Sequence, residues 1–182
     1  MLRFAALSTL AAVACFIASP VAADDTKLNV KEGDKFPDVP LAAAQIDKVK
    51  KDAKAVSIAD LKGKNVVIFF YPKALTKGCT IESCGFRDIS SEFPKDTVLL
   101  GASGDDVALQ QKFIDTEKLP YPLLCDTDLT LIKALGIQAA KGKTAQRLTF
   151  VVDKEGKIAK IYEKVAVGTH PKEVLEFVKT VK

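Results

Sequence analysis

The sequence predicts a single α/β domain of three layers built around a mixed sheet. Three observations support this class. Apolar runs typical of buried strands alternate with helix-like patterns through the middle of the chain. Two further strand-like runs, Leu148–Val152 and Lys157–Tyr162, are joined by a short turn and form a hairpin. A last helix pattern begins at Pro171. The order β-α-β-α followed by β-β-α requires parallel and antiparallel neighbours in one sheet.

The first part of the domain contains the most uncertain elements and the clearest strand. Residues Asp24–Asp38 look like an extended lead-in with turn signals. The stretch Ala42–Ala53 fits either a short helix or a loop insertion, whereas Lys54–Ile58 is predicted as a strand. A turn is expected at Asp60–Lys64. The unbroken apolar run Val66–Tyr71 predicts a strand that is buried on both faces.

Helices and strands then alternate. The stretch Cys79–Phe93 is predicted as a helix because its apolar residues recur at four-residue spacing until Pro94. The following elements are predicted, in order, as a strand at Thr97–Ala102, a helix at Asp105–Leu119, a short strand at Leu123–Leu124, a short helix at Leu129–Leu135 closed by Gly136, the hairpin, and a final helix carrying Val174, Val178 and Val181.

The N-terminus predicts export. Residues Met1–Ala23 combine an early Arg3, an apolar middle and small residues before the first acidic pair, which is typical of a secretory signal peptide. We therefore expect a signal peptide at 1–23, one domain at 24–182 and a periplasmic location, with no membrane attachment after cleavage. Two alternatives are a retained anchor and a lipoprotein, because Ala12–Cys15 loosely resembles a lipobox.

Charge and composition exclude several functions. The formal net charge is +4 and the lysines are scattered, without a basic stripe interleaved with aromatic residues, so we expect no nucleic-acid partner. His170 is the only histidine, which weakens every catalytic triad. Zinc binding by His170 with Cys79, Cys84 and Cys125 is conceivable, but the Cys-x4-Cys spacing is poor for it. We expect no metal and no cofactor.

The cysteines carry the chemistry. Cys79 follows the buried strand and a short Thr/Gly loop, where a helix pattern opens. Backbone N–H groups and the dipole at a helix N-terminus stabilise a thiolate, which is the nucleophilic form of cysteine. Cys84 lies five residues further on. This pair suits a redox cycle, whereas Cys125 is expected to be a partly buried structural thiol.

The same region resembles a known family. The pattern Pro72-x-x-x-Thr76-x-x-Cys79 matches the peroxiredoxin motif. The longer run that resembles the peroxiredoxin Q, or bacterioferritin comigratory protein, group is Gly78-Cys79-Thr80-x-Glu82-x-Cys84-Gly85-Phe86-Arg87-Asp88. The similarity continues from about Gly33 to the C-terminus. It implies a thioredoxin-like fold, reduction of hydrogen peroxide and organic hydroperoxides, a thioredoxin-like protein or small thiols as reductant, and a monomer.

The resemblance also implies residue roles. Cys79 would be the peroxidatic cysteine and Cys84 the resolving one. Arg147 would pair with the thiolate and hold the peroxide, Thr76 would hydrogen-bond the peroxide, and Pro72 would shield the thiolate. The alternative interpretations are that Pro72 only ends a strand, Thr76 is an ordinary loop residue, Arg147 is a surface cation and Cys84 is a small core residue.

Two neighbouring charges are interpreted as structural. Arg87, deep in the predicted helix, is expected to form an ion pair, and Glu82 is expected to pair locally in the first turn without a catalytic role. The sequence departs from the group just before the cysteine, where Ala74-Leu75 and Lys77-Gly78 replace the usual acidic residues and Pro-Gly. The rim of the site is therefore more apolar, which leaves the preferred peroxide open.

Helix geometry adds a requirement. Residues five apart in a continuous helix have Cα atoms roughly 8–9 Å apart, whereas a disulfide needs about 4.4–6.8 Å. The turns between Cys79 and Cys84 must therefore unwind before these cysteines can bond, and Gly85→Ala is expected to stiffen the segment.

Two rival functions differ in their cysteine chemistry. A thiol–disulfide oxidoreductase on the same fold would favour Cys-x-x-Cys, and Thr76 and Arg147 would be superfluous for it. A redox-inert exported binding module would keep Cys79 and Cys84 permanently bonded.

Overall fold

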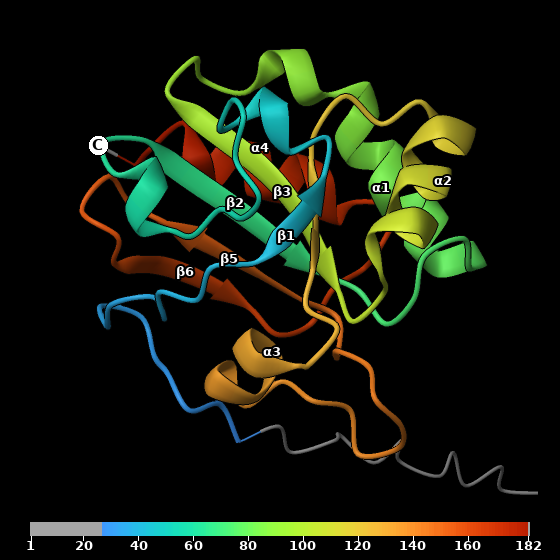
Figure 1. Ribbon diagram of the computed structural model, residues 1–182. Helices are drawn as coiled ribbons and strands as arrows, with labels where there is room; N and C mark the ends of the chain where they lie inside the picture. Colours follow the sequence, from blue (N-terminus) through green and yellow to red (C-terminus); the bar gives the residue numbers. More distant parts are fainter. Residues whose placement is uncertain (1–26, 182) are drawn as a thin grey trace, which may run out of the picture.

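A six-stranded mixed sheet forms the centre of the protein, for which the computed structural model describes residues 27–181 (Figure 1). The predicted signal peptide at 1–23 lies outside these residues. The strands are β1 (Ala42–Ala44), β2 (Asn65–Phe70), β3 (Thr97–Ser103), β4 (Leu123–Cys125), β5 (Leu148–Val152) and β6 (Ile158–Tyr162), in the spatial order β1-β4-β3-β2-β5-β6. The β2–β3 and β3–β4 pairs are parallel and the other three are antiparallel, so the predicted mixed sheet is confirmed.

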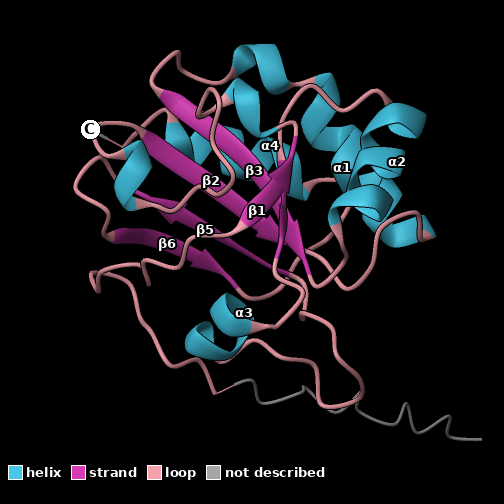
Figure 2. Ribbon diagram, in the orientation of Figure 1, coloured by secondary structure: helices cyan, strands magenta, loops and turns pink. Residues whose placement is uncertain are grey.

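Helices cover both faces of this sheet (Figures 1 and 2). One face carries α1 (Lys77–Asp88), α2 (Val107–Glu117) and α4 (His170–Val178), whose buried side chains form one apolar cluster with the sheet. The other face carries α3 (Thr130–Leu135), which packs into a second cluster with the N-terminal segment. The predicted three-layer α/β architecture is therefore confirmed.

Strand β2 lies at the centre because its side chains are apolar on both sides. Ile68 and Phe70 enter the cluster beneath α3, whereas Val67, Phe69 and Tyr71 enter the cluster beneath α1, α2 and α4. Every residue of β2 is buried, as the unbroken apolar run predicts. The strand ends just before the segment 72–79, which carries the cysteine motif, so this segment lies at the carboxyl end of two parallel strands.

Local signals explain where the other helices begin and end. The Asp106 side chain caps α2 by accepting a hydrogen bond from the Leu109 N–H at 2.8 Å. Gly136 ends α3 in the left-handed conformation, with φ of 75°, and Pro171 lies in the first turn of α4. No helix within residues 27–181 is both long enough and apolar enough to cross a membrane.

The structure differs from the predicted elements in three places. The uncertain stretch at 42–53 begins with β1 and continues into a 3-10 turn at Ile46–Lys48. The strand predicted at Lys54–Ile58 is wrong, because only Val56 pairs there, in a single bridge to Leu41. The helix predicted at Cys79–Phe93 begins two residues earlier and ends at Asp88, where the Ser90 hydroxyl binds the Arg87 carbonyl and a 3-10 turn follows.

Candidate active site

Cys79 occupies the third position of α1 and its side chain is buried, with 1% exposure. The helix starts where Thr76 leaves the extended conformation, and the Thr80 N–H makes an early helical bond to the Thr76 carbonyl at 2.8 Å. The backbone N–H groups of the first turn have no partners within the helix, so they and the helix dipole favour negative charge at this end. The sequence therefore predicted the environment of Cys79 correctly.

Arg147 reaches this thiol from the residue before β5. Its Nη2 donates to Cys79 Sγ at 3.1 Å, and the side chain is only 21% exposed. The neighbouring strand β5 is antiparallel to β2, and this pairing brings residues 68 positions apart into contact. Arg147 is thus not a free surface cation. Its close approach is eased by Gly78, where an added Cβ would lie 3.4 Å from Nη2.

Glu82 holds the other side of the same guanidinium. Its Oε2 accepts from Arg147 Nη1, and its side chain is fully buried. Burial raises the pKa of the Glu82 carboxyl to about 7, although the charge and hydrogen bond of Arg147 oppose the shift. The pairing is therefore not the local one expected from the sequence: Glu82 orients the cation that touches Cys79.

The loop before α1 holds Pro72 and Thr76 on either side of a fixed bend. Pro72 directly follows the end of β2 and Tyr71, and is half-buried. The Thr76 hydroxyl donates to the Lys73 carbonyl at 2.9 Å. Its oxygen can then accept a further hydrogen bond. Between them Leu75 adopts φ of 61°, a conformation that is unfavourable for a large side chain and that concentrates at functional sites.

A series of side-chain hydrogen bonds holds this loop in place. Asp105 accepts from the Ala74 N–H at 2.7 Å and from the Ser103 hydroxyl at 2.8 Å. Ser103 in turn accepts from Gln110 Nε2 at 2.8 Å, and Gln110 Oε1 accepts from the Tyr71 hydroxyl at 2.6 Å. The series joins Tyr71, directly after β2, to β3, α2 and the loop, so it fixes the backbone from which Thr76 and Cys79 project.

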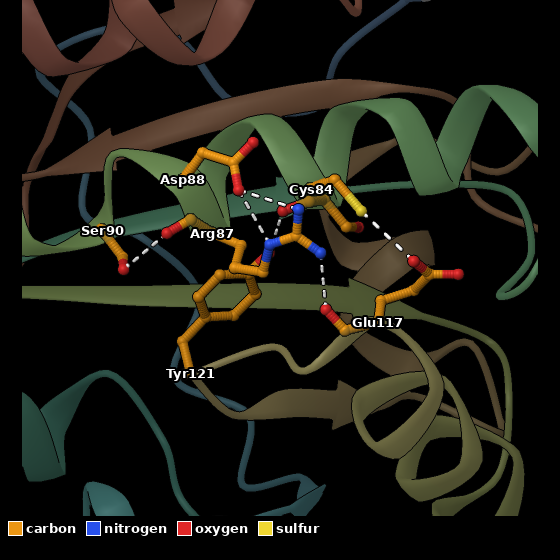
Figure 3. A network of polar contacts seen from close by, with 7 residues as sticks. Cys84, Arg87, Asp88, Ser90, Glu117 and Tyr121 are labelled. Atoms are coloured by element: carbon orange, nitrogen blue, oxygen red, sulfur yellow. Dashed lines mark hydrogen bonds and ion pairs between the residues drawn. The ribbon is translucent and has the colours of Figure 1, made fainter.

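Cys84 is the eighth of the twelve residues of α1 and is half-buried. Its Sγ donates at 3.4 Å to Oε2 of Glu117, which is the last residue of α2 (Figure 3). Burial, followed by the hydrogen bond to Glu117, raises the pKa of the Cys84 thiol. Arg87 forms the predicted ion pair, with Asp88 at 2.8 Å. Cys79, Cys84 and Cys125 are all free thiols.

Cys125 and His170 are buried but do not take part in the contact between Arg147 and Cys79. Cys125 lies in β4, and burial raises the pKa of its thiol to about 11, which fits the predicted structural thiol. His170 packs edge-on against Phe86, and its Nε2 lies 2.7 Å from the Thr149 hydroxyl. Within residues 27–181, no three His, Cys, Asp or Glu side chains are grouped in a way that could hold a metal ion.

The arrangement brings together a nucleophilic sulfur, a cation and a hydroxyl-bearing loop at one helix end. Arg147 and Cys79 are in contact, and Thr76 lies one helical turn before the thiol. Such a site stabilises a thiolate and can bind a small polar molecule that the sulfur attacks. Sequence reasoning missed Asp105, and it missed the role of Glu82. An acidic residue three positions after the cysteine falls on the same helix face, which was a usable signal for Glu82.

Comparisons with known proteins agree on the family. The model of the AhpC/TSA family matches residues 33–161. A protein named peroxiredoxin Bcp from Bacillus subtilis is 36% identical over 159 residues, which cover 84% of this chain and 97% of that protein. Peroxiredoxin Bcp from Escherichia coli is 35% identical over 136 residues, covering 71% and 87%. Among solved structures, peroxidoxin BcpB from Mycobacterium tuberculosis matches with a TM-score of 0.72 and 30% identity, covering 84% of this chain and 98% of that one.

Proposed function

The chain belongs to the AhpC/TSA family and is a thiol peroxidase of the peroxiredoxin Q type, and we propose that it reduces hydrogen peroxide and organic hydroperoxides through Cys79 and Cys84. The observation that carries the assignment of Cys79 is its 3.1 Å contact with Arg147 Nη2 at the N-terminus of α1. Neither Cys84 nor Cys125 has an arginine donor to its sulfur among the hydrogen bonds of residues 27–181.

In the first step the Cys79 thiolate attacks one peroxide oxygen. The S–O bond forms as the O–O bond breaks, so the sulfur is oxidised to a sulfenic acid and the peroxide is reduced to water or an alcohol. The departing oxygen develops negative charge before it takes up a proton. Arg147 donates into this space with a planar fork and is itself oriented by Glu82, so its charge is in place before the reaction begins.

Thr76 and Pro72 shape the approach of the peroxide. Because the Thr76 hydroxyl already donates to Lys73, its oxygen would accept a hydrogen bond from the peroxide O–H. Stabilisation of the departing oxygen is then left to Arg147 and the helix N–H groups. Pro72, half-buried at the end of β2, would limit water near the thiolate.

In the second step the Cys84 sulfur attacks the sulfenic sulfur of Cys79. A disulfide forms, and the Cys84 proton leaves with the sulfenic hydroxyl as water. Both cysteines lie within the continuous helix α1, five residues apart, so the turns between them must open first. The intrachain disulfide would then be reduced by a thioredoxin-like protein or by small thiols.

We also propose that the protein is exported to the periplasm as a monomer. The support for export is the charged, apolar and small-residue pattern of Met1–Ala23, whereas the monomer rests only on the resemblance to the peroxiredoxin Q group. A reductant would then be required outside the cytoplasm, because the oxidising compartment does not reduce the disulfide.

The test is peroxide consumption by purified protein comprising residues 24–182. Wild type is expected to turn over with hydrogen peroxide and cumene hydroperoxide when a thioredoxin system is supplied, whereas Cys79→Ser should be inactive. A thiol–disulfide oxidoreductase would instead reduce a disulfide substrate without consuming peroxide. Full turnover by Cys79→Ser would disprove the assignment of the peroxidatic cysteine.

A further inference from the structure

Residues 83–87 of α1, which include Cys84, are hydrogen-bonded to one short segment of the chain. This segment, residues 117–121, lies at and after the end of α2. Three hydrogen bonds make this connection. Cys84 Sγ donates to Glu117 Oε2 at 3.4 Å, Arg87 Nη1 donates to the Glu117 carbonyl at 2.7 Å, and the Tyr121 hydroxyl donates to the Ser83 carbonyl at 2.6 Å. Figure 3 shows Arg87 and Cys84 both directed toward Glu117.

Glu117 can bind both Arg87 and Cys84 because it lies at the end of α2. Glu117 is the last residue of the helix, and Lys118 reverses the chain in the left-handed conformation with φ of 56°. The Glu117 carbonyl has lost its helical partner, so it accepts from the Arg87 guanidinium. The same backbone position therefore anchors Arg87, while its side chain reaches Cys84.

The groups that face Cys84 shift the pKa of its thiol in opposite directions. Burial has the largest effect on its pKa and raises it, and the hydrogen bond and charge of Glu117 raise it further. Arg87 lowers it, and Asp88 contributes a small increase. Tyr121 also lies close to this thiol, and burial raises the pKa of Tyr121 well above its ordinary value, so it stays neutral.

We propose that Glu117 is a positioning residue that retains Cys84 at the end of α2 in the reduced, helical protein and thereby delays the resolving step. The proposal rests on Cys84 being the resolving cysteine. Attack on the Cys79 sulfenic acid requires Cys84 to leave Glu117, because the two cysteines cannot bond within an intact helix. Glu117 would thus set how long the sulfenic acid persists, and with it the exposure of Cys79 to a second peroxide.

The first measurement isolates the thiol contact without requiring peroxidase activity. In a Cys79→Ser, Cys125→Ser background only Cys84 remains in the chain from residue 24 onward. Replacing Glu117 by Gln keeps the size of the side chain and removes its charge. The Gln amide oxygen can still accept from the thiol, but without charge the hydrogen bond is weaker. Alkylation of Cys84 by iodoacetamide, followed across pH, should then begin at lower pH and run about threefold to tenfold faster at neutral pH, the effect of losing the charge assistance.

The second measurement follows resolution itself. Reduced enzyme is mixed with one equivalent of hydrogen peroxide, quenched with a thiol-blocking reagent at successive times, and the disulfide is quantified by intact mass. Glu117→Gln and Glu117→Ala should form the Cys79–Cys84 disulfide about threefold to tenfold faster than wild type. Formation of the sulfenic acid should be unchanged, and sulfinic acid at high peroxide should decrease.

Asp115→Asn is the matched control. Asp115 lies on the same helix end, is exposed, and accepts from Gln111 Nε2 at 2.9 Å rather than from Cys84. It should resemble wild type in both measurements. Unchanged or slower resolution in Glu117→Gln would overturn the proposal, and slower resolution would assign Glu117 as the acceptor of the Cys84 proton instead. If wild type fails to consume peroxide, the proposed function fails, whereas the alkylation result still reports whether Glu117 holds Cys84.

Discussion

Removing the guanidinium of Arg147 is the most direct perturbation of the proposed first step. In Arg147→Ala the 3.1 Å contact to Cys79 Sγ is lost, and the contact to Glu82 is lost with it. A hydrogen bond to a charged partner contributes about 1.5–3 kcal/mol, and the guanidinium is largely shielded from water. At about 1.4 kcal/mol for each tenfold, we expect the rate with peroxide to fall by roughly 10- to 100-fold.

The same substitution also affects stability through Glu82, and the two effects must be separated. Breaking a buried ion pair by removing one partner costs about 3–5 kcal/mol when the remaining charge stays ionised. Burial already raises the pKa of Glu82 to about 7, and without the opposing Arg147 it would rise further, so the carboxyl can take up a proton instead. We therefore expect a smaller loss in urea unfolding at pH 6 than at pH 8. Adding Glu82→Gln should restore the stability at pH 8 without restoring the rate.

The assay is the second-order rate with hydrogen peroxide, measured in a Cys84→Ser background together with the rate of Cys79 alkylation at neutral pH. Arg147→Ala should slow both reactions, because the sulfur loses its cationic neighbour. Arg147→Lys should recover only part of the rate, because an ammonium lacks the planar fork that contacts both Cys79 and Glu82. Peroxide and alkylation rates that both stay within about twofold of wild type would refute the reasoning and leave the N-terminus of helix α1 as the principal source of thiolate stabilisation.

Three further perturbations test other parts of the molecule. Cys84→Ser should consume about one equivalent of peroxide and then stop at the Cys79 sulfenic acid, observed by intact mass; undiminished turnover with a thioredoxin system would remove Cys84 as the resolver. Gly85→Ala should lower the melting temperature, because its Cβ would lie 2.8 Å from Cγ of Pro171 in α4; an unchanged or higher temperature would contradict this packing. Burial lowers the pKa of His170 to about 4, so the stability from its neutral form is present above about pH 6.5 and is lost as the pH falls toward 4. His170→Gln should therefore remove about 3 kcal/mol of the change in unfolding free energy between those pH values, and an equally steep profile would argue against it.

The sequence predicted most of the fold because its strongest signals are local. The apolar run of β2, the Asp153–Gly156 turn and the proline that starts α4 each depend on residues close in the chain, and the structure contains all three elements. The errors occur where the structure of a segment depends on strand pairing with a distant part of the chain. The strand predicted at Lys54–Ile58 has the right composition, but only Val56 finds a partner across the loop. β1 is short and becomes a strand by pairing with β4, about 80 residues away along the chain.

The residue types of the site and the Cys79–Arg147 contact were predictable, but the partner of Glu82 was not. Cys79 and Arg147 followed from a motif and a strand start, whereas the Arg147–Glu82 pair depends on β5 lying beside β2. The expectation that Gly85→Ala stiffens α1 considered only helix propensity. It did not include α4, whose Pro171 leaves no free space for a Cβ there. A single sequence contains no direct record of such approaches between distant segments.

Helix α1 takes part in both steps of the proposed cycle, because it carries both cysteines and each cysteine is held by different contacts. Near its start, Arg147 contacts both Cys79 and Glu82, and these contacts favour the closed helix while the thiolate waits for peroxide. Further along the helix, Glu117 retains Cys84. Oxidation changes only the first set: a neutral sulfenic acid attracts Arg147 less strongly than a thiolate does, so the N-terminal turn loses part of its support after the first step. Opening of the helix is thereby coupled to the chemical state of Cys79. Hydrogen exchange should accordingly show weaker protection from Cys79 to Phe86 in the oxidised protein than in the reduced protein, and equal protection in both states would mean that the thiols meet without this unwinding.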